Sequence, residues 1–246
     1  MRQVGHEHVD PGLLLSVLRG RVATPHSDFF WLPPHPSDPL GLVALDRDLS
    51  VDRLVSAYRH GIFPWPDSSL PGAIPWVCPP RRAILEFDAL RVPKSLRRVR
   101  RRACTAFRFT TDLAFPEVIQ ACAAVPRPGQ QGTWITSAMI AAYLELHRRG
   151  HAHSVEMWAD DTLVGGLYGV TAGGVFTGES MFHRINDASK LCVLHLVEHL
   201  QARGATWLDI QQLTPHFAAL GAREIPRQEF LALLAAEQRA GRVLFG

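Results

Sequence analysis

The sequence predicts an α+β fold built on a mixed, mainly antiparallel sheet. In the second half of the chain, strand-like segments separated by tight turns lead into a long amphipathic helix, and a short apolar strand follows it. The composition is 47% hydrophobic and 20% charged, which favours a packed globular protein. A chain of 246 residues has room for one large domain or two unequal ones. We expect a poorly defined leader (1–28), a small N-terminal domain (29–80) and a larger C-terminal domain (81–246).

Proline and glycine dominate the N-terminal region and limit its regular structure. Residues 29–39 are rich in proline and aromatic residues, so an extended loop is expected there. Ser50 is a candidate N-cap for a helix that carries Val51, Leu54, Val55 and Tyr58 and stops at Gly61. Residues 61–80 then predict a long, at least partly ordered loop, and such loops in compact proteins are often functional.

Two further helices are expected in the middle of the chain. Asp112 is the candidate cap of a helix with Phe115, Val118, Ile119 and Cys122 on its inner face. Thr136 is the candidate cap of the next helix, which places Met139, Ile140, Tyr143, Leu144 and His147 at helical spacing before Gly150.

The pattern then changes from helical to strand periodicity. Strands are predicted at 153–158, 163–170, 175–180 and 206–211, with turns at 160–161 and 172–174. Asp187 is expected to cap a helix over 188–203, closed by Gly204, with Leu191, Leu194, Leu196, Val197 and Leu200 as its apolar positions. A last helix is expected from Pro226 to about Gln238.

Charge and composition exclude several functional classes. No apolar stretch approaches the length of a membrane-spanning helix, and the N-terminus lacks a secretion-signal pattern, so we expect a cytoplasmic protein with no membrane association. Four scattered cysteines and the histidines at 147, 151 and 153 form no recognisable metal set, so no metal is expected. The net charge is only +3, yet basic residues crowd positions 81–108, which indicates either a phosphate-rich partner or a solvated basic face.

Two short polar segments are candidates for chemistry. Glu179 follows Gly178 at the end of an apolar strand, where backbone can approach a ligand closely. Asp209 and Gln211 point to the same side of a predicted strand between apolar neighbours, so they must be exposed or hydrogen-bonded. Taken alone, each segment is more typical of a strand with solvated polar residues than of a functional site.

A set of short motifs, in order along the chain, resembles the bacterial leucyl/phenylalanyl-tRNA–protein transferase family. The resemblance covers roughly residues 29–240, and the combined order and spacing make it specific. The motifs are LVSAYRHGIFPW (54–65), PPRRAIL (79–85), TWI (133–135), HAHSVE (151–156), LVGGLYG (163–169), GESMF (178–182), DASK (187–190), DIQ (209–211) and LGA (220–222).

The resemblance implies both a fold and a reaction. The fold is a small N-terminal domain followed by a C-terminal domain similar to the GNAT acyltransferases. The enzyme would move Leu or Phe, and less readily Met, from aminoacyl-tRNA to the N-terminal Arg or Lys of an acceptor protein, which marks that protein for N-end rule degradation. No cofactor is implied, and we expect a monomer.

The resemblance also implies site residues by position. Gln211 would receive the proton of the attacking amine, Asp209 would polarise Gln211, and Glu179 would hold the basic N-terminus of the acceptor or its amine. The 3′ adenosine of the tRNA would contact Trp65, Trp134 and Tyr143. The amino-acid side chain would occupy a pocket formed by Leu167, Phe176, Leu196, Leu200 and Leu208. We further expect the arginines of the basic block to bind tRNA phosphates, namely Arg97, Arg98, Arg101 and Arg102.

Two other functions are compatible with the pattern. An acetyl-CoA-dependent N-acetyltransferase has a similar fold, although no pyrophosphate-binding glycine loop is evident here. A non-catalytic tRNA-binding protein would need only the basic block. One departure from the family also concerns the site: His183 stands where a serine is common after Met-Phe, and it is expected to alter acceptor preference or pH dependence.

Overall fold

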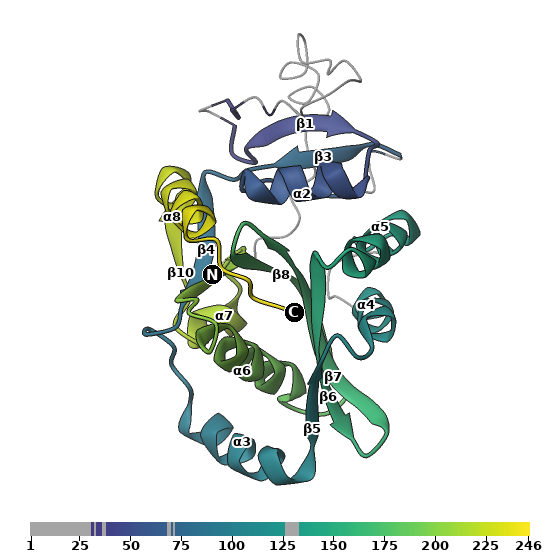
Figure 1. Ribbon diagram of the computed structural model, residues 1–246, viewed down its shortest axis with the longest axis vertical. Coiled ribbons are helices and arrows are strands. Elements are labelled where there is room, and N and C mark those ends of the chain that lie inside the picture. Colours follow the sequence, from purple (N-terminus) through teal and green to yellow (C-terminus); the bar gives the residue numbers. More distant parts are fainter. Residues whose placement is uncertain (1–30, 32, 36–37, 68–69, 71, 126–132) are drawn as a thin grey trace.

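The computed structural model describes residues 31, 33–35, 38–67, 70, 72–125 and 133–246, and these form two sheets with helices around them (Figure 1). The expected leader, 1–28, lies outside the described residues. The expected boundary at residues 80 and 81 falls between the last strand of the first sheet and the first strand of the second.

The first sheet has three strands in the order β1-β3-β2 and packs with helix α2 (Val51–Arg59). Its strands are β1 (Leu42–Asp46), β2 (Phe63–Pro64) and β3 (Ile74–Val77). Ser50 caps α2 as expected, since its side chain accepts the backbone N–H of Arg53. The prediction of a continuous loop over 61–80 was wrong in part, because β2 and β3 pair within that segment.

The second sheet has seven strands in the order β10-β4-β9-β8-β7-β6-β5. All neighbours are antiparallel except β8 and β9, so the expected mixed, mainly antiparallel sheet is confirmed. The strands are β4 (Arg81–Glu86), β5 (Arg108–Thr111), β6 (Ala152–Ala159), β7 (Thr162–Ala172), β8 (Val175–His183), β9 (Trp207–Gln211) and β10 (Arg223–Pro226). Sequence patterns predicted β6 to β9 within a few residues.

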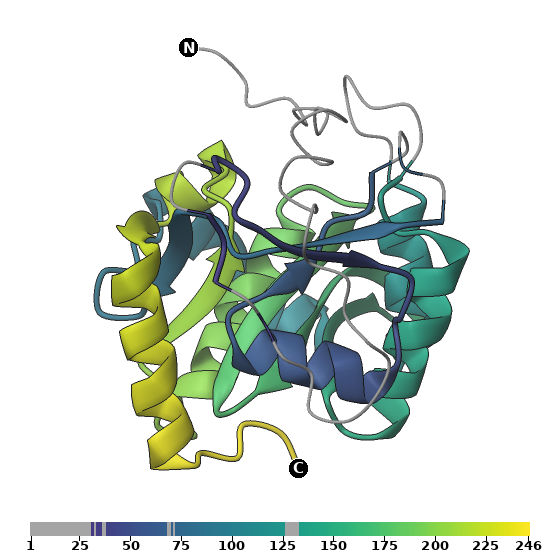
Figure 2. The same cartoon turned by 90° about the horizontal axis from the view of Figure 1, so that it is seen from above.

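Helices cover both faces of the larger sheet. One face packs against α4 (Phe115–Ala123), α5 (Ser137–Arg148) and the N-terminal sheet, while the other packs against α3 (Lys94–Ala106) and α6 (Ala188–Gln201). Helix α7 (Pro215–Ala219) follows β9, and α8 (Arg227–Ala240) packs beside β10 and β4. Figure 2 shows α8 and the α4–α5 pair on opposite sides of the N-terminal strands. The N-terminal elements therefore share a core with the larger sheet.

Helix caps were predicted with mixed success. Thr136 caps α5 through the backbone N–H of Met139, as expected. Asp112 does not cap α4: the N-cap residue is Ala114, and Asp112 has a φ of 59° and accepts the backbone N–H of Ser154 instead. Asp187 occupies the N-cap position of α6, but its carboxylate binds Lys190 and makes no capping hydrogen bond.

The parallel pair β8 and β9 is joined by the α6 crossover, as parallel neighbours require. Their backbone register contains one pair, Thr177 with Asp209. Two residues further along each strand stand Glu179 and Gln211, so the crossover brings two segments that are distant in sequence to the same point.

Candidate active site

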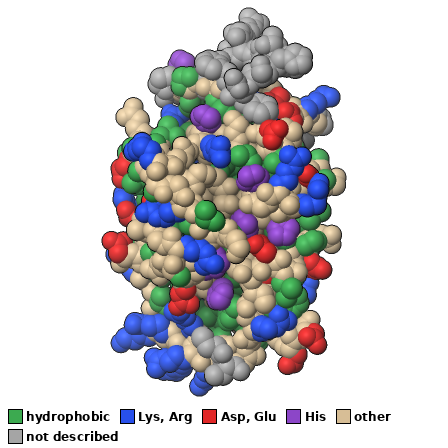
Figure 3. Space-filling model, in the orientation of Figure 1, with side chains coloured by type: hydrophobic (Ala, Val, Ile, Leu, Met, Phe, Trp, Pro, Cys, Tyr) green, Lys and Arg blue, Asp and Glu red, His purple; other side chains and the backbone are tan. Residues whose placement is uncertain are grey.

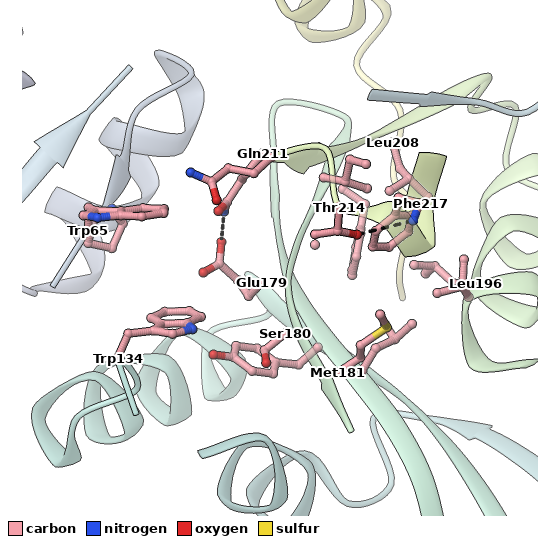
Figure 4. Close-up of a pocket in the computed structure, with 18 of the residues that line it drawn as sticks. Trp65, Trp134, Glu179, Ser180, Met181, Leu196, Leu208, Gln211, Thr214 and Phe217 are labelled. Atoms are coloured by element: carbon pink, nitrogen blue, oxygen red, sulfur yellow. Dashed lines mark hydrogen bonds between the residues drawn. The ribbon is translucent and has the colours of Figure 1, made fainter. Parts of the chain in front are cut away.

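A cavity of about 570 Å³ opens between strands β8 and β9 and the segments that follow β2 and precede α5. Its wall combines residues of β7, β8, β9, α6 and α7 with the segments around Trp65 and Trp134. Figure 4 shows Trp65, Trp134, Glu179 and Gln211 at one end, and Leu196, Leu208 and Phe217 at the other. The cavity therefore has an aromatic and polar end and an apolar end.

The apolar end contains four of the five residues expected for a side-chain pocket: Leu167, Phe176, Leu196 and Leu208. Leu200 is not in the wall and is fully buried one turn beyond Leu196 on α6. Sequence reasoning missed other residues of this wall, since only the folded sheet brings them together: Met181, Val193, Ile210 and Phe217.

Two tryptophans line the other end of the cavity. Trp65 follows β2 and Trp134 precedes α5, and both rings are half-buried. Flat aromatic faces of this kind can stack on a nucleobase. Tyr143, expected in the same role, lies outside the wall, since it is fully buried and its hydroxyl group points to Glu179.

The Glu179 carboxylate is the centre of a hydrogen-bond network. It accepts the hydroxyl of Tyr58 at 2.8 Å, the hydroxyl of Tyr143 at 3.2 Å and the side-chain amide of Gln211 at 2.6 Å. Burial raises the pKa of Glu179 to about 7, although the two tyrosine hydroxyls act to lower it. A carboxyl group with such a pKa can both bind and release a proton near neutral pH.

Tyr58 is a site residue that sequence reasoning placed only on the apolar face of a helix. It comes from α2, and its hydroxyl lies 2.5 Å from that of Tyr143 on α5. Burial, followed by the charge of Glu179, raises the pKa of both tyrosines well above 10. Both hydroxyls therefore stay protonated and can donate to Glu179.

Gln211 ends β9 in a strained conformation. Its φ is 61°, which is uncommon for residues other than glycine, and Gln212 donates its N–H to the carbonyl of Ile210 at 2.6 Å. This i to i+2 hydrogen bond around a residue of positive φ is typical of the rare classic γ-turn. The turn holds the Gln211 side chain against Glu179 (Figure 4). Strain of this kind is concentrated at functional sites.

Asp209 lies beneath this turn and is fully buried. Its carboxylate forms a bidentate ion pair with Arg82 at 2.8 and 2.6 Å and accepts the hydroxyl of Thr177. It also accepts the backbone N–H of Gln211 at 2.8 Å, so its contact with Gln211 is through the main chain and not through the side-chain amide. Arg82 donates in addition to the carbonyl of Gly61, which lies four residues before Trp65.

Part of the basic block forms helix α3, on the far side of α6 from the N-terminal sheet. Arg97, Arg98, Arg101 and Arg102 are all exposed, while Arg100 forms an ion pair with Glu198 on α6. Figure 3 shows lysine and arginine side chains gathered at the lower end of the molecule, where Figure 1 places α3. The four arginines predicted to bind phosphate thus share one accessible helix.

Two of the three histidines considered as metal ligands, His147 and His153, make other contacts. His153 donates to Asp112 at 2.7 Å, and His147 stacks on Phe115. Within the described part of the chain, histidine, cysteine and acidic residues form no group that could hold a metal ion. His183 is exposed at the end of β8 and does not line the cavity. In the same part of the chain, helices are too short or too polar to cross a membrane.

Two family models match the chain. The one described as leucyl/phenylalanyl-tRNA protein transferase matches residues 84–235, and the one described as the N-terminal domain of that enzyme matches residues 47–80. Together they include every cavity residue discussed above.

Among solved structures, similarity is low. The structure of L-PGS from Bacillus licheniformis shares 11% identity over 55% of this chain and 48% of that chain, with a TM-score of 0.39. A putative lysylphosphatidylglycerol synthetase domain from Agrobacterium fabrum has a TM-score of 0.38, with 10% identity over 78% of this chain and 56% of that one. No conclusion about the fold follows from these values.

Similarity to curated proteins is much higher. The leucyl/phenylalanyl-tRNA–protein transferase of Anaeromyxobacter sp. (strain K) is 51% identical over 82% of this chain and 85% of its own length. The protein of that name from Pseudoalteromonas atlantica is 53% identical over 79% of this chain and 81% of its own. The chain therefore belongs to the leucyl/phenylalanyl-tRNA protein transferase family.

Proposed function

We propose that this protein is an aminoacyltransferase that moves Leu or Phe from aminoacyl-tRNA to the N-terminal Arg or Lys of an acceptor protein. Met-tRNA is a further, poorer donor in this proposal. The observation that carries it is the cavity, which joins an apolar end, a pair of tryptophans and a proton-handling carboxyl group in a member of this family. The apolar end suits the transferred side chain, the tryptophans suit the 3′ adenosine of the tRNA, and the carboxyl group suits the amine of the acceptor.

The apolar end is suited to the amino-acid side chain. Leu167, Phe176, Leu196 and Leu208 offer no polar group that would distinguish one hydrophobic side chain from another. A hydrophobic pocket separates substrates that differ by a methylene by only about 1–3 kcal/mol. Use of Leu, Phe and Met follows from such a pocket, while Trp65 and Trp134 stack on the 3′ adenosine.

The reaction needs positioning and a route for one proton. The α-amine nitrogen of the acceptor attacks the ester carbonyl carbon, a C–N bond forms, and the bond to the 3′ oxygen of the terminal ribose breaks. The amine loses a proton and the ribose oxygen gains one. Because the ester is already activated, correct placement of the two substrates supplies much of the rate.

Gln211 and Glu179 divide the proton handling in this proposal. Gln211 receives the N–H of the attacking amine through its amide oxygen, since its amide nitrogen is directed to Glu179. An amide is a poor base, so the proton passes to Glu179, whose pKa of about 7 suits this role. The attacking α-amine is in its neutral form, and the carboxylate of Glu179 also attracts the positively charged side chain of the acceptor's N-terminal Arg or Lys.

Asp209 acts as a positioning residue. Its hydrogen bond to the backbone N–H of Gln211 supports the γ-turn, and Arg82 balances its buried charge. On the surface, the four exposed arginines of α3 hold tRNA phosphates. Charge-assisted contacts of this kind would orient the tRNA while its acceptor end occupies the cavity.

The proposal also includes the fold of the C-terminal region, the oligomeric state and the fate of the products. The C-terminal region adopts a GNAT-like arrangement, supported by the α6 crossover between the parallel strands β8 and β9 within an otherwise antiparallel sheet. The enzyme acts as a monomer in the cytoplasm, and its products enter N-end rule degradation.

A transfer assay tests this function. The purified protein is incubated with tRNA that carries labelled Phe and with a protein beginning with Arg. Ribonuclease-sensitive transfer of label to the acceptor is the expected result. Transfer of acetyl from acetyl-CoA without transfer from tRNA would instead identify an acetyltransferase, and tRNA binding without any transfer would identify a binding protein.

A further inference from the structure

The last residues of the chain return from α8 to the back of the candidate site. Figure 1 shows the segment after α8 ending in the middle of the view, and Figure 2 shows it running along one edge of the molecule, away from α8. Leu244 is only 3% exposed, and Phe245 is half-buried. Within this tail, residues 243–246, Leu244 and Phe245 are packed against the fold, while Val243 and Gly246 are exposed.

Contacts from two elements hold the tail in place. His199 on α6 donates from Nε2 to the carbonyl of Leu244 at 2.9 Å. The ring of Phe245 stacks on His153 of β6, with centroids 4.0 Å apart and planes within 8°, and it also meets His199 at 4.5 Å. His153 is itself held by Asp112 at 2.7 Å. The position of Phe245 is thus well defined.

Phe245 contacts one residue of the cavity wall. Its ring centroid lies 5.7 Å from that of Phe176, which lines the apolar end of the cavity and is 1% exposed. On another side, the Phe176 ring lies over Gly169, where an added Cβ would approach the ring to 2.5 Å. Phe176 is therefore enclosed by Gly169, Phe245 and the cavity.

We propose that Phe245 determines amino-acid specificity by fixing how far the Phe176 ring extends into the side-chain pocket. This inference rests on the proposed function, because it takes the apolar end of the cavity as the pocket for the transferred side chain. Phe245 touches Phe176 and not the substrate, so it is a positioning residue. Interiors are close-packed, so a change in volume behind Phe176 is transmitted to the pocket.

Changes in the size of residue 245 should alter the pocket in opposite directions. Phe245→Ala leaves space into which Phe176 can withdraw, so the pocket deepens and favours Phe over Leu, which would leave a void. Phe245→Trp pushes Phe176 toward the cavity, which favours Leu over Phe. A methylene more or less in a hydrophobic pocket changes kcat/KM about 10-fold or more. We therefore expect each variant to change the ratio of kcat/KM for Phe-tRNA to that for Leu-tRNA by about tenfold.

The test measures kcat/KM for Phe-tRNA and Leu-tRNA with the intact wild-type protein, Phe245→Ala and Phe245→Trp. The informative quantity is the ratio of the two values for each protein, because a loss of folded enzyme cancels in that ratio. Val243→Ala serves as the control, since Val243 lies in the same tail and is 76% exposed. Its ratio should equal that of the wild type.

The expected result is a ratio of Phe to Leu use that rises in Phe245→Ala and falls in Phe245→Trp. Equal ratios in all four proteins would overturn the role of Phe245 while leaving the transferase activity intact. A wild-type protein that transfers neither amino acid would instead overturn the proposed function itself.

Discussion

The side-chain amide of Gln211 donates to the Glu179 carboxylate at 2.6 Å and links the ends of two parallel strands. The hydrogen bond crosses from β9 to β8 just beyond their one paired position. The Glu179 carboxylate also accepts the hydroxyls of Tyr58 and Tyr143. Elements from both halves of the chain therefore converge on a single carboxyl group.

The raised pKa of Glu179 predicts a specific dependence of stability on pH. In the folded protein this carboxyl keeps its proton up to about pH 7, whereas in the unfolded chain it loses it near pH 4.5. The folded state thus binds more protons between these values, so the contribution of Glu179 to the free energy of unfolding falls as pH rises through this window. Urea unfolding at several pH values measures the slope.

Glu179→Gln provides the comparison, because it removes the titration with little change in shape. The variant should show a smaller fall in stability between about pH 4.5 and pH 7 than the wild type. Identical slopes would mean that Glu179 titrates at its usual value and is not a base poised near neutrality.

The positive φ of Gln211 predicts an unusual order of stability among its variants. Gln211→Gly should be more stable than Gln211→Ala by about 1 kcal/mol, because glycine adopts left-handed backbone without steric cost. Thermal or urea unfolding of the two variants measures the difference. At the neighbouring Gln212, which lacks a positive φ, glycine should be the less stable of the two. The same order at both positions would argue against strain at Gln211.

The ion pair between Arg82 and Asp209 predicts coupled losses of stability. Both groups are buried, so removal of one leaves the other charged and unpaired at a cost of about 3–5 kcal/mol. Arg82→Met and Asp209→Asn should each be strongly destabilising, and the double variant should lose less than the sum of the two. A double-mutant cycle measured by urea unfolding checks this, and strictly additive losses would rule out the coupling.

The exposed arginines of α3 predict a change in the salt dependence of tRNA binding. Replacing Arg97, Arg98, Arg101 and Arg102 by Ala should lower the slope of log affinity against log salt concentration by about 3, because fewer counterions are released. Filter binding at several salt concentrations measures the slope. A variant with equal charge loss elsewhere is the control, with Arg59, Arg148, Arg149 and Arg239 replaced by Ala; its slope should change little. Equal changes of the slope in both variants would mean that the arginines of α3 are solvated and do not bind tRNA phosphates specifically.

Local features of the fold could be predicted from the sequence wherever a short-range signal determines them. Ser50 and Thr136 cap helices as expected, because a hydroxyl beside the first turn needs no distant partner. Asp112 has the same local signature, yet its carboxylate binds the backbone of Ser154, which only the folded sheet brings near. The short strands β2 and β3 were missed for a similar reason, since their pairing overrides the proline-rich composition of the segment.

The candidate site was harder to predict from the sequence than the fold, because its residues come together through contacts between distant segments. Strand periodicity placed Asp209 and Gln211 on one side of β9, but it could not give their partners: the Gln211 side chain binds Glu179, and the Asp209 carboxylate binds Arg82. Nothing in the sequence alone placed Glu179 next to Gln211, because that contact depends on the crossover through α6. Tyr58 was expected only as part of an apolar helix face. Its hydroxyl donates to Glu179 because the fold brings α2 next to β8.

The most direct test of the site is single-turnover transfer of labelled Phe from tRNA by Gln211→Ala and Glu179→Gln. Both variants should transfer at least about 100-fold more slowly than the wild type, with unchanged affinity for tRNA, because each removes part of the proton route. Leu213→Ala, which alters an exposed neighbour outside the cavity wall, should transfer at the wild-type rate. Wild-type rates in Gln211→Ala and Glu179→Gln would contradict the account and show that the chemistry takes place elsewhere.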